Sequence, residues 1–252
     1  MIIIYDFDGT LTPYSLPQYE ILKKCGYNDE RLMKRIKEEI QKGTVTELYD
    51  AYYKCYIDIL SENGIAISKD IACLGANQVA FNPGVVDYCK RFQSQTTGIK
   101  HYIVTAGIKD YVEETPISKF IDGAYGVIFK QENGKWGDID FLLTDKEKVN
   151  VIKKVQNENR GTNDIIYFGD GLTDNFAFEY VHSIGGKNVF VKTNAQSEIT
   201  YQKLNVNGII DECFDADFRT HSDIDKYIRK QIIEQKWKIF KFKANSKDSN
   251  IT

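Results

Sequence analysis

Residues 2–12 read IIIYDFDGTLT, and this stretch decides the fold class. A short, continuous apolar run that ends in acids and a glycine is typical of a strand buried on both faces of a parallel sheet. Four later runs share this character: HYIVTAG at 101–107, DIIYFGDG at 164–171, NVFV at 188–191 and GIIDE at 208–212. Helical patterns separate most of them, and this alternation predicts an α/β fold built on a doubly wound parallel sheet.

The end of the first predicted strand carries two acids, Asp6 and Asp8, on either side of Phe7. Strand alternation places both carboxylates on one face, where they repel each other unless a cation lies between or above them. A hard divalent cation such as magnesium takes oxygen ligands and keeps positions open for phosphate. Gly9 allows a sharp departure from the strand and brings backbone N–H groups close to a ligand.

Two further strand ends carry polar groups that belong with this pair. Thr105 ends the second predicted strand, and its hydroxyl with the backbone of Ala106 and Gly107 suits a phosphate oxygen. Asp170 and Asp174 lie in a second acidic loop, at the end of the strand over 164–171. In doubly wound sheets ligands bind at the carboxyl ends of the strands, so we expect these groups to meet.

The metal ligands follow from this convergence. Asp6, Asp8 and Asp170 are predicted to hold Mg²⁺, with Asp8 able to contribute its backbone carbonyl. Three acids on adjacent strand ends cannot sit together uncompensated. A lysine is also expected, because the nucleophile and the phosphate are both negative.

The segment between the first two strands is too long for one crossover, since 99 residues separate Asp6 from Thr105. Helical patterns fill this segment at roughly 16–25, 29–42, 45–62 and 69–80. We therefore predict a helical cap over 13–80, inserted in a core formed by 1–12 and 81–240. A flexible tail is expected over 241–252, which is rich in Lys, Asn and Ser. The aromatic residues of the cap are expected to pack within it; they include Tyr14, Tyr19, Tyr52 and Tyr53.

After the second strand, residues 125–143 are predicted to form a β-hairpin. Asn133-Gly134 separates two strand-like stretches, and this dipeptide is a strong hairpin signal. Thr144 and Glu147 then form a capping-box pattern that opens a helix through about residue 157.

These residues together resemble the haloacid dehalogenase (HAD) superfamily. DFDGTLT at 6–12 matches its first motif, IVTAG at 103–107 its second, and GDGLTDN at 169–175 its fourth. The order and spacing agree over most of residues 1–215, and the helical insert resembles the cap of the phosphoserine-phosphatase-like branch. The first motif is specific, and the fourth at the right distance makes coincidence very rare, whereas the second alone would carry no weight.

The resemblance implies a role for each matched residue. Asp6 is the nucleophile that attacks phosphorus, and Asp8 protonates the leaving oxygen and then activates the hydrolytic water. Thr105 binds the phosphoryl group, Asp170 binds magnesium, and Asp174 supports the loop of Asp170. Cleavage of a carbon–halogen bond needs no acid two residues after the nucleophile, so Asp8 favours phosphoryl transfer.

The lysine of the third motif has two candidates, Lys146 and Lys148. From Lys148, apolar residues follow at plus three, four and seven, whereas from Lys146 two of the same offsets are polar. Phosphoserine-phosphatase-like members show the first pattern, and this favours Lys148.

Departures from these relatives count against phosphoserine as the substrate. Phosphoserine phosphatases usually have Ser where this chain has Gly9, an acid where it has Ser15, and Ser-Gly-Gly where it has Thr105-Ala106-Gly107. Glu20 could read a substrate amine, although a glutamate on a helix surface is the commoner explanation. The expected activity is hydrolysis of another small-molecule phosphate monoester. A phosphomutase on the same scaffold, and a non-catalytic binder of a phosphorylated metabolite, remain as alternatives.

Composition limits the partners. The formal charge is −3 and the isoelectric point about 5.7, which argues against a nucleic-acid surface. No apolar run approaches the ~20 residues that span a bilayer, so no membrane segment is expected. The five cysteines are an odd number with no C-x-x-C spacing. This usage favours reduced thiols in a cytoplasmic protein without structural zinc.

Overall fold

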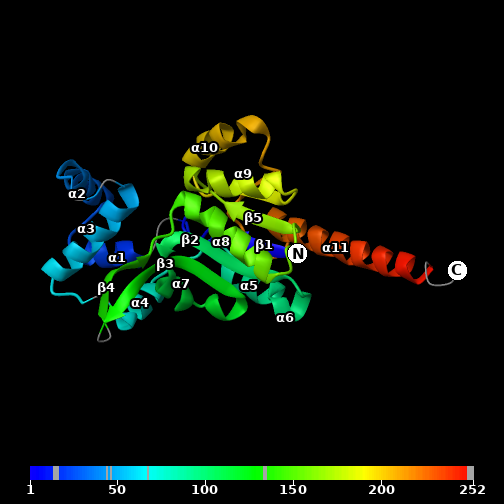
Figure 1. The fold of residues 1–252 in the computed structure, drawn as a ribbon, viewed down its shortest axis with the longest axis horizontal. Helices are drawn as coiled ribbons and strands as arrows, with labels where there is room; N and C mark the ends of the chain where they lie inside the picture. Colours follow the sequence, from blue (N-terminus) through cyan, green and yellow to red (C-terminus); the bar gives the residue numbers. More distant parts are fainter. Residues whose placement is uncertain (14–16, 44, 46, 67, 133–134, 249–252) are drawn as a thin grey trace.

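The computed structural model describes residues 1–13, 17–43, 45, 47–66, 68–132 and 135–248. It contains a seven-stranded sheet in the order β4-β3-β2-β1-β5-β6-β7. The strands are β1 Ile2–Tyr5, β2 Lys100–Ile108, β3 Gly123–Glu132, β4 Lys135–Phe141, β5 Ile165–Gly169, β6 Lys187–Lys192 and β7 Glu212–Asp215. All neighbouring pairs are parallel except β3 and β4, so the predicted α/β parallel sheet is confirmed (Figure 1).

Helices fill the connections between these strands. Between β1 and β2 lie α1 Pro17–Lys24, α2 Asp29–Gln41, α3 Leu48–Glu62, α4 Lys69–Ala76, α5 Val85–Phe92 and α6 Ser94–Thr97. The later helices are α7 Lys109–Glu113, α8 Asp145–Glu158, α9 Asn175–Ser183, α10 Gln196–Leu204 and α11 Asp223–Asp248. Short 3₁₀ turns lie at Ser118–Phe120, Leu172–Asp174 and Asn205–Asn207.

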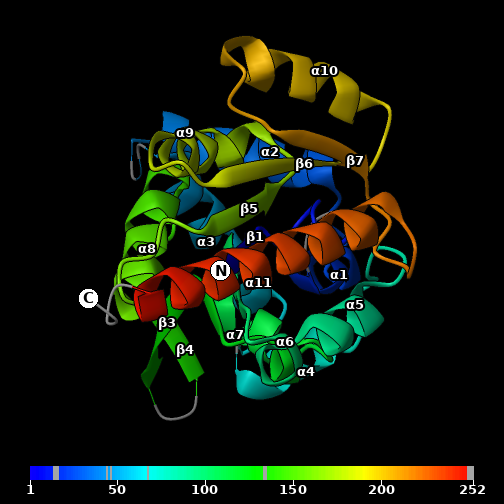
Figure 2. The ribbon, with the colours of Figure 1, turned by 90° about the vertical axis from the view of Figure 1, so that its right-hand side faces the viewer.

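Strand β1 is buried on both faces, as its apolar run predicted. Ile2 and Ile4 belong to a core cluster with residues of α8 and α9, whereas Ile3 and Tyr5 belong to a second cluster with residues of α5 and α11. Figure 2 shows α9 on one side of the sheet and α11 on the other. Alternation along one strand therefore supplies two separate helix–sheet interfaces.

Helices α1, α2 and α3 gather at one end of the molecule, away from the C-terminus (Figure 1). Tyr53, Tyr56, Ile59 and Leu60 form the buried side of α3, and Ile36 of α2 belongs to the same core cluster. Asn28 and Ser68 cap α2 and α4 with side-chain oxygens that accept from backbone N–H groups. Of the helices described between β1 and β2, α1 to α4 lie close to the four positions that periodicity predicted.

The predicted hairpin over 125–143 is confirmed as β3 and β4, with Glu132 opposite Lys135. The Asn133-Gly134 turn itself lies outside the described residues. The hairpin does more than was predicted, because β3 also pairs in parallel with β2 and so extends the main sheet. Thr144 accepts from the N–H of Glu147, as the capping pattern predicted.

Two expectations near the C-terminus need correction. The strand predicted over 208–212 is displaced, since β7 begins at Glu212 and only that residue is shared. Gly208 has φ +63°, and the N–H of Asp211 donates to the carbonyl of Asn188, so the chain turns into the sheet edge before pairing. The tail expected from residue 241 is helical as far as Asp248, because α11 continues to that residue.

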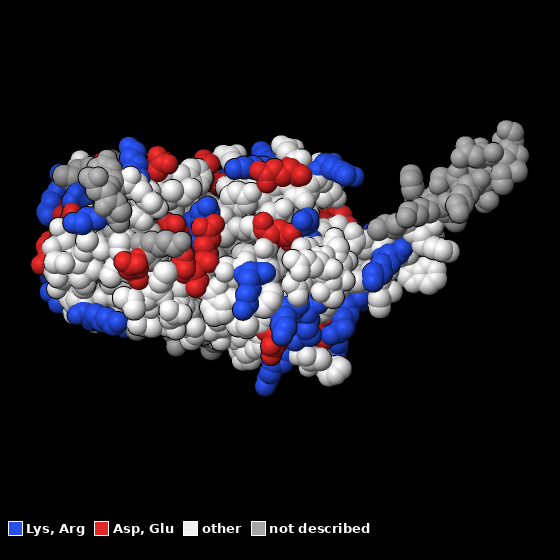
Figure 3. All heavy atoms as spheres, turned by 90° about the horizontal axis from the view of Figure 1, so that it is seen from below, with Lys and Arg blue, Asp and Glu red and all other residues white. Residues whose placement is uncertain are grey.

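The surface and helix lengths bear on possible partners. Figure 3 shows one face of the molecule on which basic and acidic side chains are interspersed. Among the described residues, no helix combines the length and the apolar character needed to cross a membrane.

Candidate active site

The candidate site lies where three neighbouring strands end. Tyr5 of β1 pairs with Ile103 of β2 and with Phe168 of β5. All three strands are parallel, so the residues that follow them reach the same edge of the sheet. This edge brings together Asp6, Asp8, Thr105, Asp170 and Asp174, as the sequence predicted.

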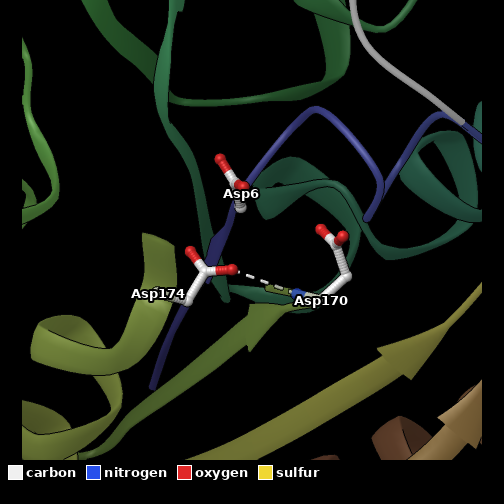
Figure 4. Close-up of side chains that lie close together, drawn as sticks. All are labelled: Asp6, Asp170 and Asp174. Atoms are coloured by element: carbon white, nitrogen blue, oxygen red, sulfur yellow. Dashed lines mark hydrogen bonds between the residues drawn. The ribbon is translucent and has the colours of Figure 1, made fainter. Parts of the chain in front are cut away.

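Three carboxylates converge at this edge (Figure 4). Asp6, Asp170 and Asp174 each offer an oxygen, and these oxygens all lie within 4.8 Å of one another. The sequence predicted Asp6, Asp8 and Asp170 as the metal ligands. Among the described residues, the carboxylates that lie this close together include Asp174 and not Asp8. The contacts of Asp174 decide what that carboxylate does.

Asp174 is fully buried, and both of its oxygens are engaged. One oxygen lies 2.7 Å from Lys148 Nζ and 2.7 Å from the hydroxyl of Tyr167. The other accepts from the N–H groups of Asp170 and Gly171, each at 3.1 Å. Asp174 therefore holds the loop that carries Asp170, which agrees with the supporting role implied for it.

Lys148 is the buried lysine of the site. It comes from α8, and its Nζ lies 3.2 Å from Asp6 Oδ1. Burial alone would lower the pKa of Lys148, but the carboxylates of Asp174 and Asp6 raise it well above its usual value, so the ammonium persists. The other candidate, Lys146, is exposed and lies 5.8 Å from the ring centre of Phe176.

Gly9 is required by the position of Asp170. Its φ is +81°, and a Cβ built on it would lie 2.1 Å from Asp170 Oδ2. The hydroxyl of Thr10 donates to Asp170 Oδ1 at 2.8 Å, and Asn82 Nδ2 donates to the carbonyl of Thr10 at 2.9 Å. The loop after β1 is thus fitted to the carboxylate of the loop after β5.

Thr105, near the carboxyl end of β2, contacts Asp8. The Thr105 hydroxyl donates to Asp8 Oδ2 at 3.3 Å and accepts from the N–H of Gly107 at 2.9 Å. The carbonyl of Ala106 accepts from the hydroxyl of Tyr53 at 2.5 Å. A tyrosine of α3 therefore bonds directly to the backbone of β2, next to Thr105.

The charge of the site fits a bound cation. Burial raises the pKa of Asp6, against the opposing charge of Lys148, and burial with the neighbouring acids raises the pKa of Asp170. Asp6 Oδ1 is buried and makes no hydrogen bond, since its approach to Lys148 is an ion pair without hydrogen-bond geometry. Carboxylates left under-compensated by one ammonium are the donor set that a hard divalent cation takes.

A cavity of about 310 Å³ opens above Asp6. Asp6, Asp8, Thr105, Ala106, Gly107, Lys148 and Thr173 line it from the sheet side, and Met33, Ile36, Leu48, Tyr49, Tyr52 and Tyr53 line it from α2 and α3. Packing within the predicted cap was expected of Tyr52 and Tyr53 in preference to a place facing the site; Tyr53 is buried, and both line the cavity. Tyr14 and Ser15, and the side chains of Tyr19 and Glu20, lie outside the described residues.

Several site residues escaped the sequence analysis. Thr10 and Asn82 fix the acidic loops through single hydrogen bonds to groups far away in sequence, and Tyr167 donates to Asp174, 7 residues further along the chain. Of these, only Tyr167 had a signal, because alternation puts a polar hydroxyl on a strand face that is otherwise apolar.

The comparisons agree with this geometry. Residues 3–178 match the family model of the haloacid dehalogenase-like hydrolases, and the chain belongs to that family. The expectation of a phosphatase of the haloacid dehalogenase type is thereby supported at the level of family and fold. No curated protein matches the sequence.

Solved structures share the fold at low sequence identity. A HAD family hydrolase from Salmonella enterica serovar Typhi has a TM-score of 0.64 at 16% identity, over 86% of this chain and 68% of its own. A phosphoserine phosphatase, solved as a phospho-aspartyl intermediate analogue, has a TM-score of 0.59 at 17% identity, over 90% and 97%. A phosphoserine phosphohydrolase-like protein from Francisella tularensis has a TM-score of 0.53 at 16% identity, over 84% and 93%.

Proposed function

We propose that this hydrolase cleaves small-molecule phosphate monoesters through an aspartyl-phosphate on Asp6, with Mg²⁺ as cofactor. The observation that carries the proposal is the environment of Asp6 Oδ1. This oxygen is buried, makes no hydrogen bond, and lies 3.2 Å from the ammonium of Lys148, and Asp6 is one of the residues that line the cavity. A nucleophilic carboxylate needs such an oxygen, held in place but not consumed by a donor.

The chemistry divides into two displacements. Asp6 attacks phosphorus while the bond from phosphorus to the ester oxygen breaks, and Asp8 gives its proton to that leaving oxygen. Water then attacks phosphorus as Asp8 takes a proton from it, which releases inorganic phosphate and restores Asp6. Asp8 is half-buried and in reach of the Thr105 hydroxyl, which suits a residue that exchanges protons at the cavity wall.

Asp6 and Asp170, with the backbone carbonyl of Asp8, would hold the Mg²⁺, which supplies positive charge against the phosphate oxygens. Asp174 is assigned to positioning, because Lys148, Tyr167 and two backbone N–H groups occupy its oxygens. Lys148 neutralises Asp6 and the bound phosphoryl group together. Thr105 and the β2 backbone at Ala106 and Gly107 form the phosphoryl-binding side.

Residues 13–80 act, in this proposal, as a cap over the site, and 1–12 with 81–240 as the catalytic core. The support is that α2 and α3 supply the cavity wall opposite Asp6. A cap that excludes water protects the aspartyl-phosphate until the hydrolytic water is positioned.

The test is phosphate release by wild type and Asp6→Asn with p-nitrophenyl phosphate, in Mg²⁺ and after chelation. We expect the Asn variant to lose at least about 10⁴-fold in kcat, because an amide is a very poor nucleophile. Chelation should abolish wild-type activity and Mg²⁺ should restore it. Substantial turnover by Asp6→Asn, or full activity without divalent cations, would refute the mechanism. Transfer of the phosphoryl group without release of phosphate would identify a mutase.

A further inference from the structure

The cavity above Asp6 has two chemically different sides. The sheet side carries the carboxylates, the ammonium of Lys148 and the hydroxyl of Thr105. The opposite side is formed by one thioether, two aliphatic side chains and three tyrosine rings, from Met33, Ile36, Leu48, Tyr49, Tyr52 and Tyr53. No described residue of α2 or α3 that lines the cavity carries a charge.

Two of the three tyrosine hydroxyls on this side donate to the catalytic core. The hydroxyl of Tyr49 donates to a carboxylate oxygen of Asp145, at the start of α8. The hydroxyl of Tyr53 donates to the carbonyl of Ala106. These bonds tie two rings to the catalytic core and leave mainly their apolar surfaces for a ligand. Tyr52 packs edge-on against Tyr53, with ring centres 4.9 Å apart.

Five charged side chains of the same helices pair with one another away from the cavity. Arg35 of α2 forms a two-pronged ion pair with Glu62 of α3. Lys54 of α3 lies 2.6 Å from Asp58 and 3.4 Å from Glu39. None of these five residues lines the cavity, so these charges bind one another and not a substrate in the cavity.

An ammonium or carboxylate on the leaving group would therefore lose its water without gaining a partner from α2 or α3, which is costly. An apolar group would instead gain from leaving water. We propose that the substrate is the phosphate monoester of an uncharged alcohol with an apolar or aromatic body. This inference rests on the proposed function. The cavity, at about 310 Å³, is near the lower limit of small-molecule pockets, so a compact body is expected.

The test compares kcat/KM for primary alkyl phosphates, whose leaving groups are all alkoxides. The apolar members are butyl phosphate and 2-phenylethyl phosphate, and the charged members are phosphoethanolamine, phosphocholine and O-phosphoserine. We expect at least about a tenfold preference for 2-phenylethyl phosphate over every charged ester. A preference for any charged ester would overturn the inference while leaving the phosphatase proposal intact. Failure to release phosphate from any ester would count against the phosphatase itself.

A matched pair of variants assigns the preference to the cavity wall. Leu48 lines the cavity and is 52% exposed, whereas Leu74 on α4 is 58% exposed and is not among the lining residues, so both sites accept a polar side chain. Leu48→Asp should lower kcat/KM for 2-phenylethyl phosphate about tenfold and should not lower it for phosphoethanolamine. Leu74→Asp should change neither value. Equal losses on both substrates in Leu48→Asp would overturn the assignment.

Glu20→Gln tests whether the carboxylate of Glu20 recognises an amine on the substrate. If a carboxylate there read an amine, phosphoserine or phosphoethanolamine would be the preferred ester and this variant would lose that preference. We expect Glu20→Gln to leave the order of the five esters unchanged. Abolition of a preference for an amine-bearing ester would overturn the inference.

Discussion

Lys148 and Asp174 form a buried ion pair, with 2.7 Å between the ammonium nitrogen and a carboxylate oxygen. Neither side chain is more than 1% exposed. The pair joins α8 to the loop after β5, and the same ammonium reaches Asp6 on the loop after β1. The ammonium of Lys148 therefore helps to hold the acidic loop in place and also offsets the negative charge of the proposed nucleophile.

Replacing this lysine tests both roles. Lys148→Met should lower kcat about 10³-fold, because the phosphoryl group loses its positive partner. It should also cost about 3 kcal/mol of unfolding free energy, since Asp6 and Asp174 stay buried without their cation. Lys146→Met, the matched control on the exposed face of α8, should remain within about 0.5 kcal/mol of wild type and retain activity. Urea unfolding and phosphate release measure the two effects. Similar losses in both variants would contradict the assignment of Lys148.

Gly9→Ala should damage the site through Asp170. The new Cβ would lie 2.1 Å from Asp170 Oδ2, so the carboxylate must move. We expect a loss of about 100-fold in apparent Mg²⁺ affinity, measured by titrating activity with the cation. Gly43→Ala is the control, because Gly43 has φ +73° but nothing within 4 Å of an added Cβ. Both variants pay the backbone cost of about 1 kcal/mol, and only Gly9→Ala should lose Mg²⁺ affinity. Unchanged affinity in Gly9→Ala would show that the carboxylate of Asp170 is not a ligand.

Asp8→Asn should separate the two chemical steps. It keeps the nucleophile Asp6 but removes the acid and base, so a good leaving group such as p-nitrophenolate should still be expelled. Hydrolysis of the aspartyl-phosphate should slow by about 10²- to 10⁴-fold. A burst of p-nitrophenolate followed by slow turnover, with a labelled phosphoenzyme isolated by acid quench, is the expected result. A linear time course at the wild-type rate would remove Asp8 from the mechanism.

His101 predicts how stability depends on pH. It is buried, its Nε2 lies 2.7 Å from the carbonyl of Phe92, and its Nδ1 lies 3.1 Å from the hydroxyl of Tyr5. A carbonyl only accepts, so Nε2 carries the proton and Nδ1 accepts from Tyr5. Burial lowers the pKa of His101 to about 4.

Between pH 6.5 and about 4 the imidazole of His101 is therefore protonated more readily in the unfolded chain than in the folded chain. The free energy of unfolding decreases as the pH is lowered through this window. From pH 7 to pH 5 the loss should be about 2 kcal/mol. His101→Gln can keep both hydrogen bonds but does not titrate, so its urea midpoint should change less over this interval. An equal pH dependence in the two proteins would show that His101 titrates normally in the fold.

Much of the fold was readable from local patterns. Ile2, Ile3 and Ile4 predicted a strand buried on both faces, and the structure places them in two core clusters. Helices α1 to α4 followed from apolar periodicity, and the hairpin from Asn133-Gly134. The displacement of β7 could not be read in this way, because Ile209 and Ile210 are apolar and buried without belonging to a strand. Burial produces the same pattern whether or not a residue pairs.

The sequence by itself determined the chemical groups at the candidate site. Asp6, Asp8 and Asp170 follow strands and Thr105 lies near the carboxyl end of β2, and parallel strands bring their carboxyl ends to one edge of the sheet. Local sequence could also rank Lys148 above Lys146, because helical offsets show which side of α8 is apolar. The strand ends need only periodicity and chain order, and the choice of Lys148 also needs the resemblance to phosphoserine-phosphatase-like members.

Only the tertiary structure decided which contacts each of those groups makes. Asp174 lies in the carboxylate cluster, but Lys148 of α8 and Tyr167 of β5 bond to one of its oxygens. The spacing of residues in the sequence does not show these contacts. Gly9 must lack a side chain because Asp170 approaches it from another strand. The apolar wall around Tyr52 likewise arises from the packing of α3 over the sheet edge. Each of these depends on distances between residues far apart in the chain, which folding alone sets.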